Sequence, residues 1–227
     1  MNKYKKNIAI FLAALFHISG TIGILFTDYK KWFIANTPLN LLLMLVLFWW
    51  VQEEKTTKFY SYSVVCFVVG MGTEMIGVNT GYIFGNYQYG SVMGIKWMGV
   101  PFLIGVTWVT VMLCCGNIMQ QLYQWVENRA DGQLDMKTNN WQKIAVLFDA
   151  ALLAVSFDWL MEPVAVKLGF WQWQNGVIPN YNYLCWFVIS FALQWLYRKM
   201  DFKKPNQFSH HLLVIQTLFF LTLRINL

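Results

Sequence analysis

Long apolar stretches separated by short polar segments dominate the chain. An apolar helix of about 20 residues crosses the ~30 Å hydrocarbon core of a bilayer. Seven stretches approach or reach that length, and the second, with Pro38 near its start, and the sixth show the pattern most weakly. The chain is therefore predicted to be all-α, a polytopic bundle of about seven transmembrane helices at residues 8–26, 35–51, 59–78, 98–118, 143–162, 183–198 and 209–226.

The composition agrees with this pattern. Hydrophobic residues make up 57% of the chain and charged residues only 12%, whereas soluble domains carry about 25% charged residues. No internal repeat, low-complexity tract or soluble domain is visible, and the longest polar stretch, 120–143, is expected to be a cytoplasmic connection. We therefore predict one integral membrane domain, residues 1–227, in the cell membrane.

The positions of the basic residues indicate an orientation. With the N-terminus in the cytoplasm, 12 of the 17 Lys and Arg residues fall in the inner connecting segments, as the positive-inside rule requires. The C-terminus is then outside. The net charge of +6 is accordingly interpreted as a consequence of topology, and nucleic acid is not an expected partner.

Three carboxylates interrupt the apolar stretches, namely Glu74, Asp158 and Glu162. Ionisable residues inside a membrane are costly and usually mark a functional site. Asp158 and Glu162 are four residues apart and share one helix face, whereas Asp149 points roughly the opposite way and is treated separately. In the predicted topology Glu74 reaches the same depth as the other two, near the outer surface.

These carboxylates suggest acid chemistry. Close carboxylates in a low-dielectric site cannot all ionise, so at least one is expected to keep its proton near neutrality and to be able to act as a general acid. The outer loops 79–97 and 166–183 are rich in aromatic residues, whose faces stabilise cations. The combination suits proton addition to an alkene, formation of a tertiary cation and capture by water. The alternative is a structural, hydrogen-bonding role for each carboxylate.

Other functions were weighed on the same residues. The four cysteines, Cys66, Cys114, Cys115 and Cys185, lie in predicted spans without metal-type spacing, so neither a disulfide framework nor a zinc site is expected. The last span contains no lysine for a retinal Schiff base. A proton-coupled small-molecule transporter remains an alternative, although no inverted repeat is visible.

Several motifs resemble one family. They are EMIGVNTGYIFGNYQY at 74–89, MGVPFLIGVTW at 98–108, FDWLMEP at 157–163, GFWQW at 169–173 and NYLCW at 182–186. Over roughly residues 70–190 the chain resembles the CruF-type carotenoid hydratases of carotenoid biosynthesis. That family often has Asp where this chain has Glu162, and Gly where it has Cys185.

The resemblance implies a cofactor-independent hydro-lyase. It would add water to the terminal 1,2 double bond of an acyclic ψ-end group, on lycopene, γ-carotene or a C50 relative. The expected partners are the carotenoid and the lipid bilayer, and other enzymes of carotenoid biosynthesis are candidates. A membrane lycopene cyclase is the nearest alternative, because protonation of the same end group also starts cyclisation.

We expect Glu74 and Asp158 to share a proton, one acting as general acid toward C2 and the other orienting water. Glu162 is expected to position water or tune that pair. Asn79 and Asn182 are predicted to hydrogen-bond the carboxylates or the product hydroxyl. The predicted substrate-binding residues are Asn79, Tyr82, Phe84, Tyr87, Trp97, Trp108, Trp171, Trp173 and Asn182.

Overall fold

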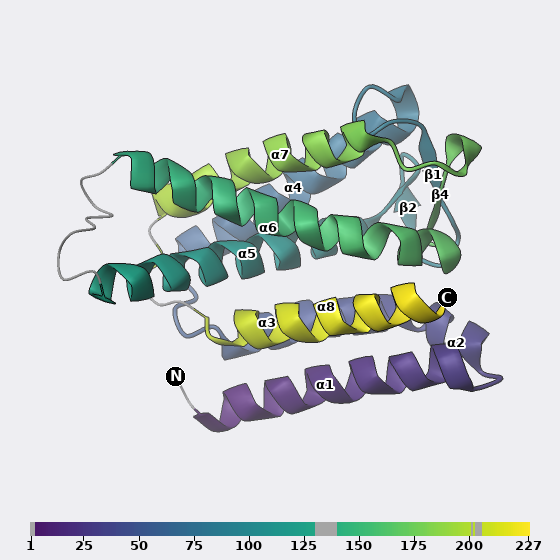
Figure 1. Ribbon diagram of the computed structural model, residues 1–227, viewed down its shortest axis with the longest axis horizontal. Coiled ribbons are helices and arrows are strands. Elements are labelled where there is room, and N and C mark those ends of the chain that lie inside the picture. Colours follow the sequence, from purple (N-terminus) through teal and green to yellow (C-terminus); the bar gives the residue numbers. More distant parts are fainter. Residues whose placement is uncertain (1–2, 130–139, 201, 203–205) are drawn as a thin grey trace.

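A computed structural model describes residues 3–129, 140–200, 202 and 206–227. Within these residues the chain forms eight α-helices, and all but the short α2 lie lengthwise beside one another (Figure 1). The N-terminus lies at one end of the bundle and the C-terminus at the other. The helices are α1 (Lys3–Phe26), α2 (Lys30–Ala35), α3 (Thr37–Val51), α4 (Thr57–Thr80), α5 (Phe102–Arg129), α6 (Asn140–Lys167), α7 (Asn180–Met200) and α8 (Phe208–Asn226).

The all-α prediction is confirmed, and the seven spans are supported in part. A helix occupies each predicted range, but only α1, α4, α5, α6 and α8 are both long and apolar enough to cross a membrane. That count covers the described part of the chain. Helix α3 is apolar but has 15 residues. Helix α7 has 21 residues and carries polar groups along its length. These are the two segments in which the sequence pattern is weakest.

Two helix boundaries differ from the prediction. Helices α5 and α6 have 28 residues each and extend into the polar stretch 120–143, of which 130–139 lies outside the described residues. The flanks were wrongly taken as connection, because Gln, Leu, Glu and Arg favour helix even when they are not apolar. Helix α5 starts at Phe102 and not at 98, because β3 (Val100–Pro101) pairs with β2 (Lys96–Trp97).

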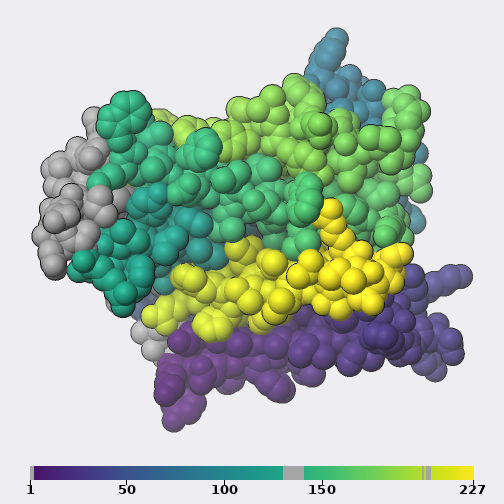
Figure 2. Space-filling model, in the orientation of Figure 1, coloured from purple at the N-terminus to yellow at the C-terminus, as the bar shows by residue number. Residues whose placement is uncertain are grey.

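Helix α8 lies at the centre of one side of the molecule. It packs against α1, α5 and α6, and Figure 2 shows it as a band between α1 and α6. Its Arg224 guanidinium lies 3.9 Å from the centre of the Trp159 ring and donates a hydrogen bond of 2.8 Å to the Trp159 carbonyl oxygen. This contact fixes the end of α8 to α6, the helix that carries two of the three carboxylates.

The two aromatic loops meet in a small antiparallel sheet. Strand β1 (Tyr87–Tyr89) pairs with β4 (Trp171–Trp173), so that Tyr87 lies opposite Trp173 and Tyr89 opposite Trp171. In both strands the outer two residues are buried and the central glutamine is exposed. The sheet lies at the end of the bundle where α4 and α6 end (Figure 1), with its four aromatic side chains on the buried face. The sequence did not reveal it, because three residues are too short to display an alternating pattern.

The two loops approach each other closely at Gly90. Its N–H donates a 2.8 Å hydrogen bond to the carbonyl oxygen of Phe170, and a Cβ at this position would lie 2.1 Å from the carbonyl oxygen of Gly169. An alanine here therefore requires the strands to move apart.

We expect Gly90→Ala to lower the free energy of unfolding by about 1–3 kcal/mol, the usual cost of overpacking. Thermal unfolding of the detergent-purified protein measures the change. Gly72→Ala is the control, since nothing lies within 4 Å of the added methyl group, and it should keep or raise the melting temperature. A Gly90→Ala variant that melts like the wild type would show that the strands do not approach this closely.

Candidate active site

The three carboxylates lie together in one cavity of about 660 Å³. Glu74 comes from α4 and Asp158 and Glu162 from α6, and their exposed fractions are only 5%, 1% and 3%. They are close enough to interact electrostatically with one another. The sequence prediction that helical spacing and depth would bring these residues together agrees with this geometry.

Glu74 is held by three hydrogen-bond donors. The hydroxyl groups of Tyr87 and Tyr89 both donate to its Oε2, with a distance of 2.7 Å for Tyr89. The indole Nε1 of Trp108 donates to Oε1 at 3.2 Å. An ionised carboxylate only accepts hydrogen bonds, so three donors and no acceptor form a site suited to the negatively charged form of Glu74.

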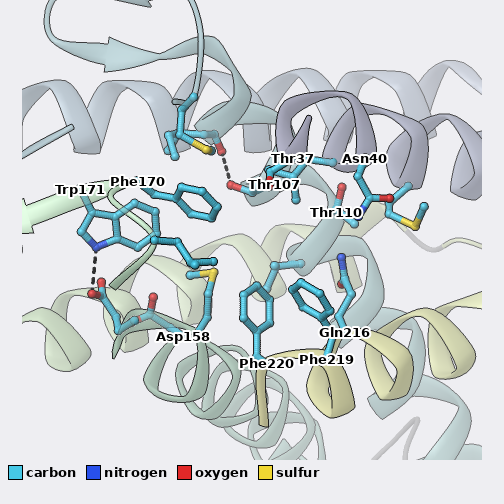
Figure 3. Close-up of a pocket in the computed structure, with 18 of the residues that line it drawn as sticks. Thr37, Asn40, Thr107, Thr110, Asp158, Phe170, Trp171, Gln216, Phe219 and Phe220 are labelled. Atoms are coloured by element: carbon cyan, nitrogen blue, oxygen red, sulfur yellow. Dashed lines mark hydrogen bonds between the residues drawn. The ribbon is translucent and has the colours of Figure 1, made fainter. Parts of the chain in front are cut away.

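Glu162 is held by the other strand of the sheet. Trp171 and Trp173 donate from their indole Nε1 atoms to the same oxygen, Oε2, at 3.0 Å and 2.9 Å. Its Oε1 accepts no hydrogen bond from the described residues. Figure 3 shows the bond from Trp171 at one end of the cavity. Thus β1 supplies phenols to Glu74, and β4 supplies indoles to Glu162.

Asp158 is the least satisfied of the three. Asn182 donates to its Oδ2 at 3.1 Å, while its Oδ1 is buried and has no hydrogen-bond partner. No hydrogen bond among the described residues joins Asp158 to Glu74, so each carboxylate has its own set of donors. The structure thus gives no direct contact of the kind expected for a Glu74–Asp158 pair that shares a proton.

Aromatic rings form much of the cavity wall. The rings of Trp108 and Trp186 are stacked, with centroids 4.0 Å apart and planes inclined by 8°, and both line the cavity. Phe170 and Phe220 lie beside the carboxylate end in Figure 3. A long apolar ligand would find a matching surface here, with electron-rich ring faces near the acids.

Most of the predicted substrate-binding residues line this cavity. They are Phe84, Tyr87, Trp108, Trp171, Trp173 and Asn182. Three others lie outside it. The Asn79 amide bonds the carbonyl oxygens of Met75 and Met98, Tyr82 is 80% exposed, and Trp97 is exposed and stacks on Phe102. The sequence pattern does not show which way side chains at the end of α4 and in the following loop point.

The structure also adds residues that are not among the predicted substrate-binding residues. The Tyr89 hydroxyl donates a hydrogen bond to Glu74. Tyr89 lies two residues after Tyr87 in the YQY segment, and this spacing could have indicated that both side chains lie on the same face of a strand. Trp186 follows the predicted motif residue Asn182 by one helical turn. His17 lines the cavity, and its Nδ1 lies 2.7 Å from the carbonyl oxygen of Ala13.

Asp149 is separate from this group. Tyr123 donates a 2.5 Å hydrogen bond to its Oδ2, and it does not line the cavity. Within the described residues, no group of three or more His, Cys, Asp or Glu side chains is placed to hold a metal ion.

The tyrosines of β1 give a testable pH dependence. Burial raises the pKa of both Tyr87 and Tyr89 well above the usual value of about 10, and the Glu74 carboxylate raises them further. Their contribution to stability is therefore complete below pH ~10 and is lost as the pH rises above it. We expect both phenols to remain neutral in the folded protein at pH values where ordinary tyrosines ionise.

Spectrophotometric titration of tyrosinate tests this expectation. The Tyr87→Phe/Tyr89→Phe double variant should match the wild type in the amplitude of the folded-state transition near pH 10 and fall below it only after denaturation. A smaller amplitude in the folded double variant would mean that these phenols titrate normally.

Comparison with known proteins places the chain in a family. A family model described as "Carotenoid biosynthesis protein" matches residues 36–227, which include all three carboxylates and both strands of the aromatic sheet. No curated protein and no solved structure matches the chain. Since the match covers most of the sequence, the chain belongs to the carotenoid biosynthesis protein family.

Proposed function

We propose that this protein is a carotenoid 1,2-hydratase, which adds water to the terminal double bond of an acyclic end group. The observation that carries the proposal is the placement of three buried carboxylates at one end of an apolar, aromatic-walled cavity. Membership of the carotenoid biosynthesis family supports a polyene substrate. The reaction needs an acid, a means of stabilising a cation and one water molecule.

Asp158 is the acid in this proposal. It is 1% exposed and has a single neutral donor, Asn182, and a buried carboxyl with few donors is least costly when it carries its proton. It transfers that proton to C2 of the end group. The positive charge then forms at C1, where it is tertiary.

Glu74 and the stacked indoles stabilise the cation. Glu74 with its three donors carries a fixed negative charge in the site, and such preorganised charge is effective because no solvent has to reorganise. The ring faces of Trp108 and Trp186 add cation–π attraction. Glu74 thus has an electrostatic role here and does not share a proton with Asp158.

Glu162 orients the water. Two indole donors hold its Oε2 in place, which leaves Oε1 to accept a hydrogen bond from a water molecule on the cation's side. The water oxygen bonds to C1 and its surplus proton passes to Glu162. Proton transfer to Asp158, one helical turn away, restores the acid, so atoms and charges balance over the cycle.

Access from the lipid fits a polyene substrate. The cavity reaches the surface beside α1, α2 and α3, where the lining residues Phe16, Trp32 and Leu39 are 44%, 59% and 65% exposed. These side chains are apolar, as expected for an opening toward acyl chains. A rod-shaped carotenoid could insert one end group there and leave its remainder in the membrane.

We also propose that all seven long helices cross the membrane, with the sheet on the outer side. The alternating direction of the helices in Figure 1 supports this topology. Cysteine labelling tests it, because the four natural cysteines are buried. In intact cells an impermeant maleimide should label Tyr82→Cys in the outer loop and not Lys55→Cys, which needs cell lysis. The reverse pattern would invert the orientation, and labelling of both would contradict the topology.

Expression in a bacterial strain that accumulates lycopene or γ-carotene tests the activity. We expect a more polar pigment, heavier than the parent by one water molecule, in chromatography and mass spectrometry. An isomer of unchanged mass would instead identify a cyclase. Conversion by purified protein in detergent, where no gradient exists, would argue against a transporter.

In the same assay Asp158→Asn should lower the hydration rate by at least ~100-fold, since general acid catalysis contributes about 10²–10⁴-fold. Glu74→Gln and Glu162→Gln should also be strongly impaired. Asp149→Asn is the matched control, because this residue lies outside the cavity, and it should retain activity. Full activity of Asp158→Asn at normal membrane levels would remove Asp158 from the mechanism.

A further inference from the structure

The cavity has a second polar end, away from the carboxylates. Figure 3 shows Asn40, Thr110 and Gln216 gathered on one side of it, with Phe219 and Phe220 between them and Asp158. They come from α3, α5 and α8, and all three line the cavity. Three separate helices thus direct polar groups into the same part of an otherwise largely apolar space.

Gln216 is the central residue of this group. It is 6% exposed, and its side-chain amide makes no hydrogen bond to any described residue. A largely buried amide that makes no hydrogen bond to the protein is destabilising unless a ligand or solvent satisfies it. In the middle of an apolar helix this destabilisation indicates that something else satisfies the amide.

The neighbouring groups complete a hydrogen-bonding site. The Oδ1 of Asn40 is buried and has no partner. The hydroxyl of Thr110 donates to the carbonyl oxygen of Val106 at 2.9 Å, which leaves its oxygen free to accept. Gln216 and Asn40 therefore offer both N–H donors and carbonyl acceptors, and Thr110 adds an acceptor. A hydroxyl group, which donates one hydrogen bond and accepts others, matches this set.

We propose, building on the function proposed above, that Gln216, Asn40 and Thr110 form a subsite that binds a hydroxyl group of an isoprenoid substrate. The reacting end group lies at the carboxylates, and the hydroxyl lies on the same molecule at a fixed distance along the chain. Oxygenated isoprenoids are then preferred ligands over pure hydrocarbons. The part of the substrate between its reacting end group and its hydroxyl contacts the apolar rings of Phe219 and Phe220.

Linear prenyl alcohols test the subsite, because each carries a terminal trisubstituted alkene at one end and a hydroxyl at the other. The probe is lycopene, which is expected to quench the fluorescence of the cavity tryptophans when bound, so that a competing ligand restores the fluorescence. With purified protein in detergent, the dissociation constants of alcohols of increasing chain length are compared with those of alkenes of equal length. We expect one alcohol length to bind on the order of tenfold more tightly than its alkene, as one or two hydrogen bonds would give.

Gln216→Leu should remove most of this preference by weakening alcohol binding, with alkene binding retained. Thr222→Val, on the same helix but outside the cavity, is the control and should preserve it. If Gln216→Leu does not fold, Asn40→Leu provides the same test. The comparison of alcohol and alkene binding by the wild-type protein needs no variant. Equal binding of alcohol and alkene at every length would overturn the subsite and would mean that solvent occupies this end.

The outcome is separable from the fate of the proposed hydratase. Prenyl binding is measured without any conversion, and hydration of a hydrocarbon carotenoid is measured without any hydroxyl. If the wild-type protein binds alcohols and alkenes equally but still hydrates the carotenoid, only the subsite is rejected. Tight alcohol binding without hydration would reject only the hydratase.

Discussion

Three carboxylates buried without any ion pair among the described residues place a demanding constraint on this structure. Each needs hydrogen-bond donors in largely apolar surroundings, and the cost of leaving them unsatisfied is several kcal/mol. The donors are phenols, indoles and an amide, all neutral. Neutral donors hold a carboxylate without cancelling its charge, so an ionised carboxylate in this site keeps a negative potential of the kind that the proposed cationic intermediate would need.

The small sheet follows from that constraint. Strand alternation places every second side chain on one face, so the YQY and WQW segments each direct two aromatic donors toward the helix ends. Pairing of the two strands sets Tyr87 and Tyr89 over Glu74, and Trp171 and Trp173 over Glu162. The close contact at Gly90 lets the two loops approach enough for both sets of bonds to form. Helices alone would not bring these donors together.

The sequence allowed many residues of this site to be predicted, but not the hydrogen bonds between them. Glu74, Asp158 and Glu162 could be grouped because membrane depth and helical spacing follow from the chain direction. Tyr87, Trp171 and Trp173 could be proposed as pocket residues because they lie close in the chain to the buried carboxylates, although Tyr and Trp at helix ends also occur as membrane-interface residues. Asn79, Tyr82 and Trp97 were placed with them only by proximity in sequence. In the structure the Asn79 amide at the end of α4 bonds backbone carbonyl oxygens, and Tyr82 and Trp97 are exposed. The separate donor sets of Glu74 and Asp158 depend on tertiary contacts such as Trp108 to Glu74, which no local pattern encodes.

The cavity also explains why helices at both ends of the chain matter to the site. Motifs and carboxylates concentrate between α4 and α7, yet the far wall of the cavity comes from α1, α3 and α8, including His17, Asn40 and Gln216. Those helices were expected only from hydropathy, and their polar residues had no visible partners in the sequence. Once packed, they extend an acid site into an elongated space with different chemistry at its two ends. An enzyme acting on a long polyene needs such a space, because the reacting bond is a small part of the molecule and the remainder must set its position.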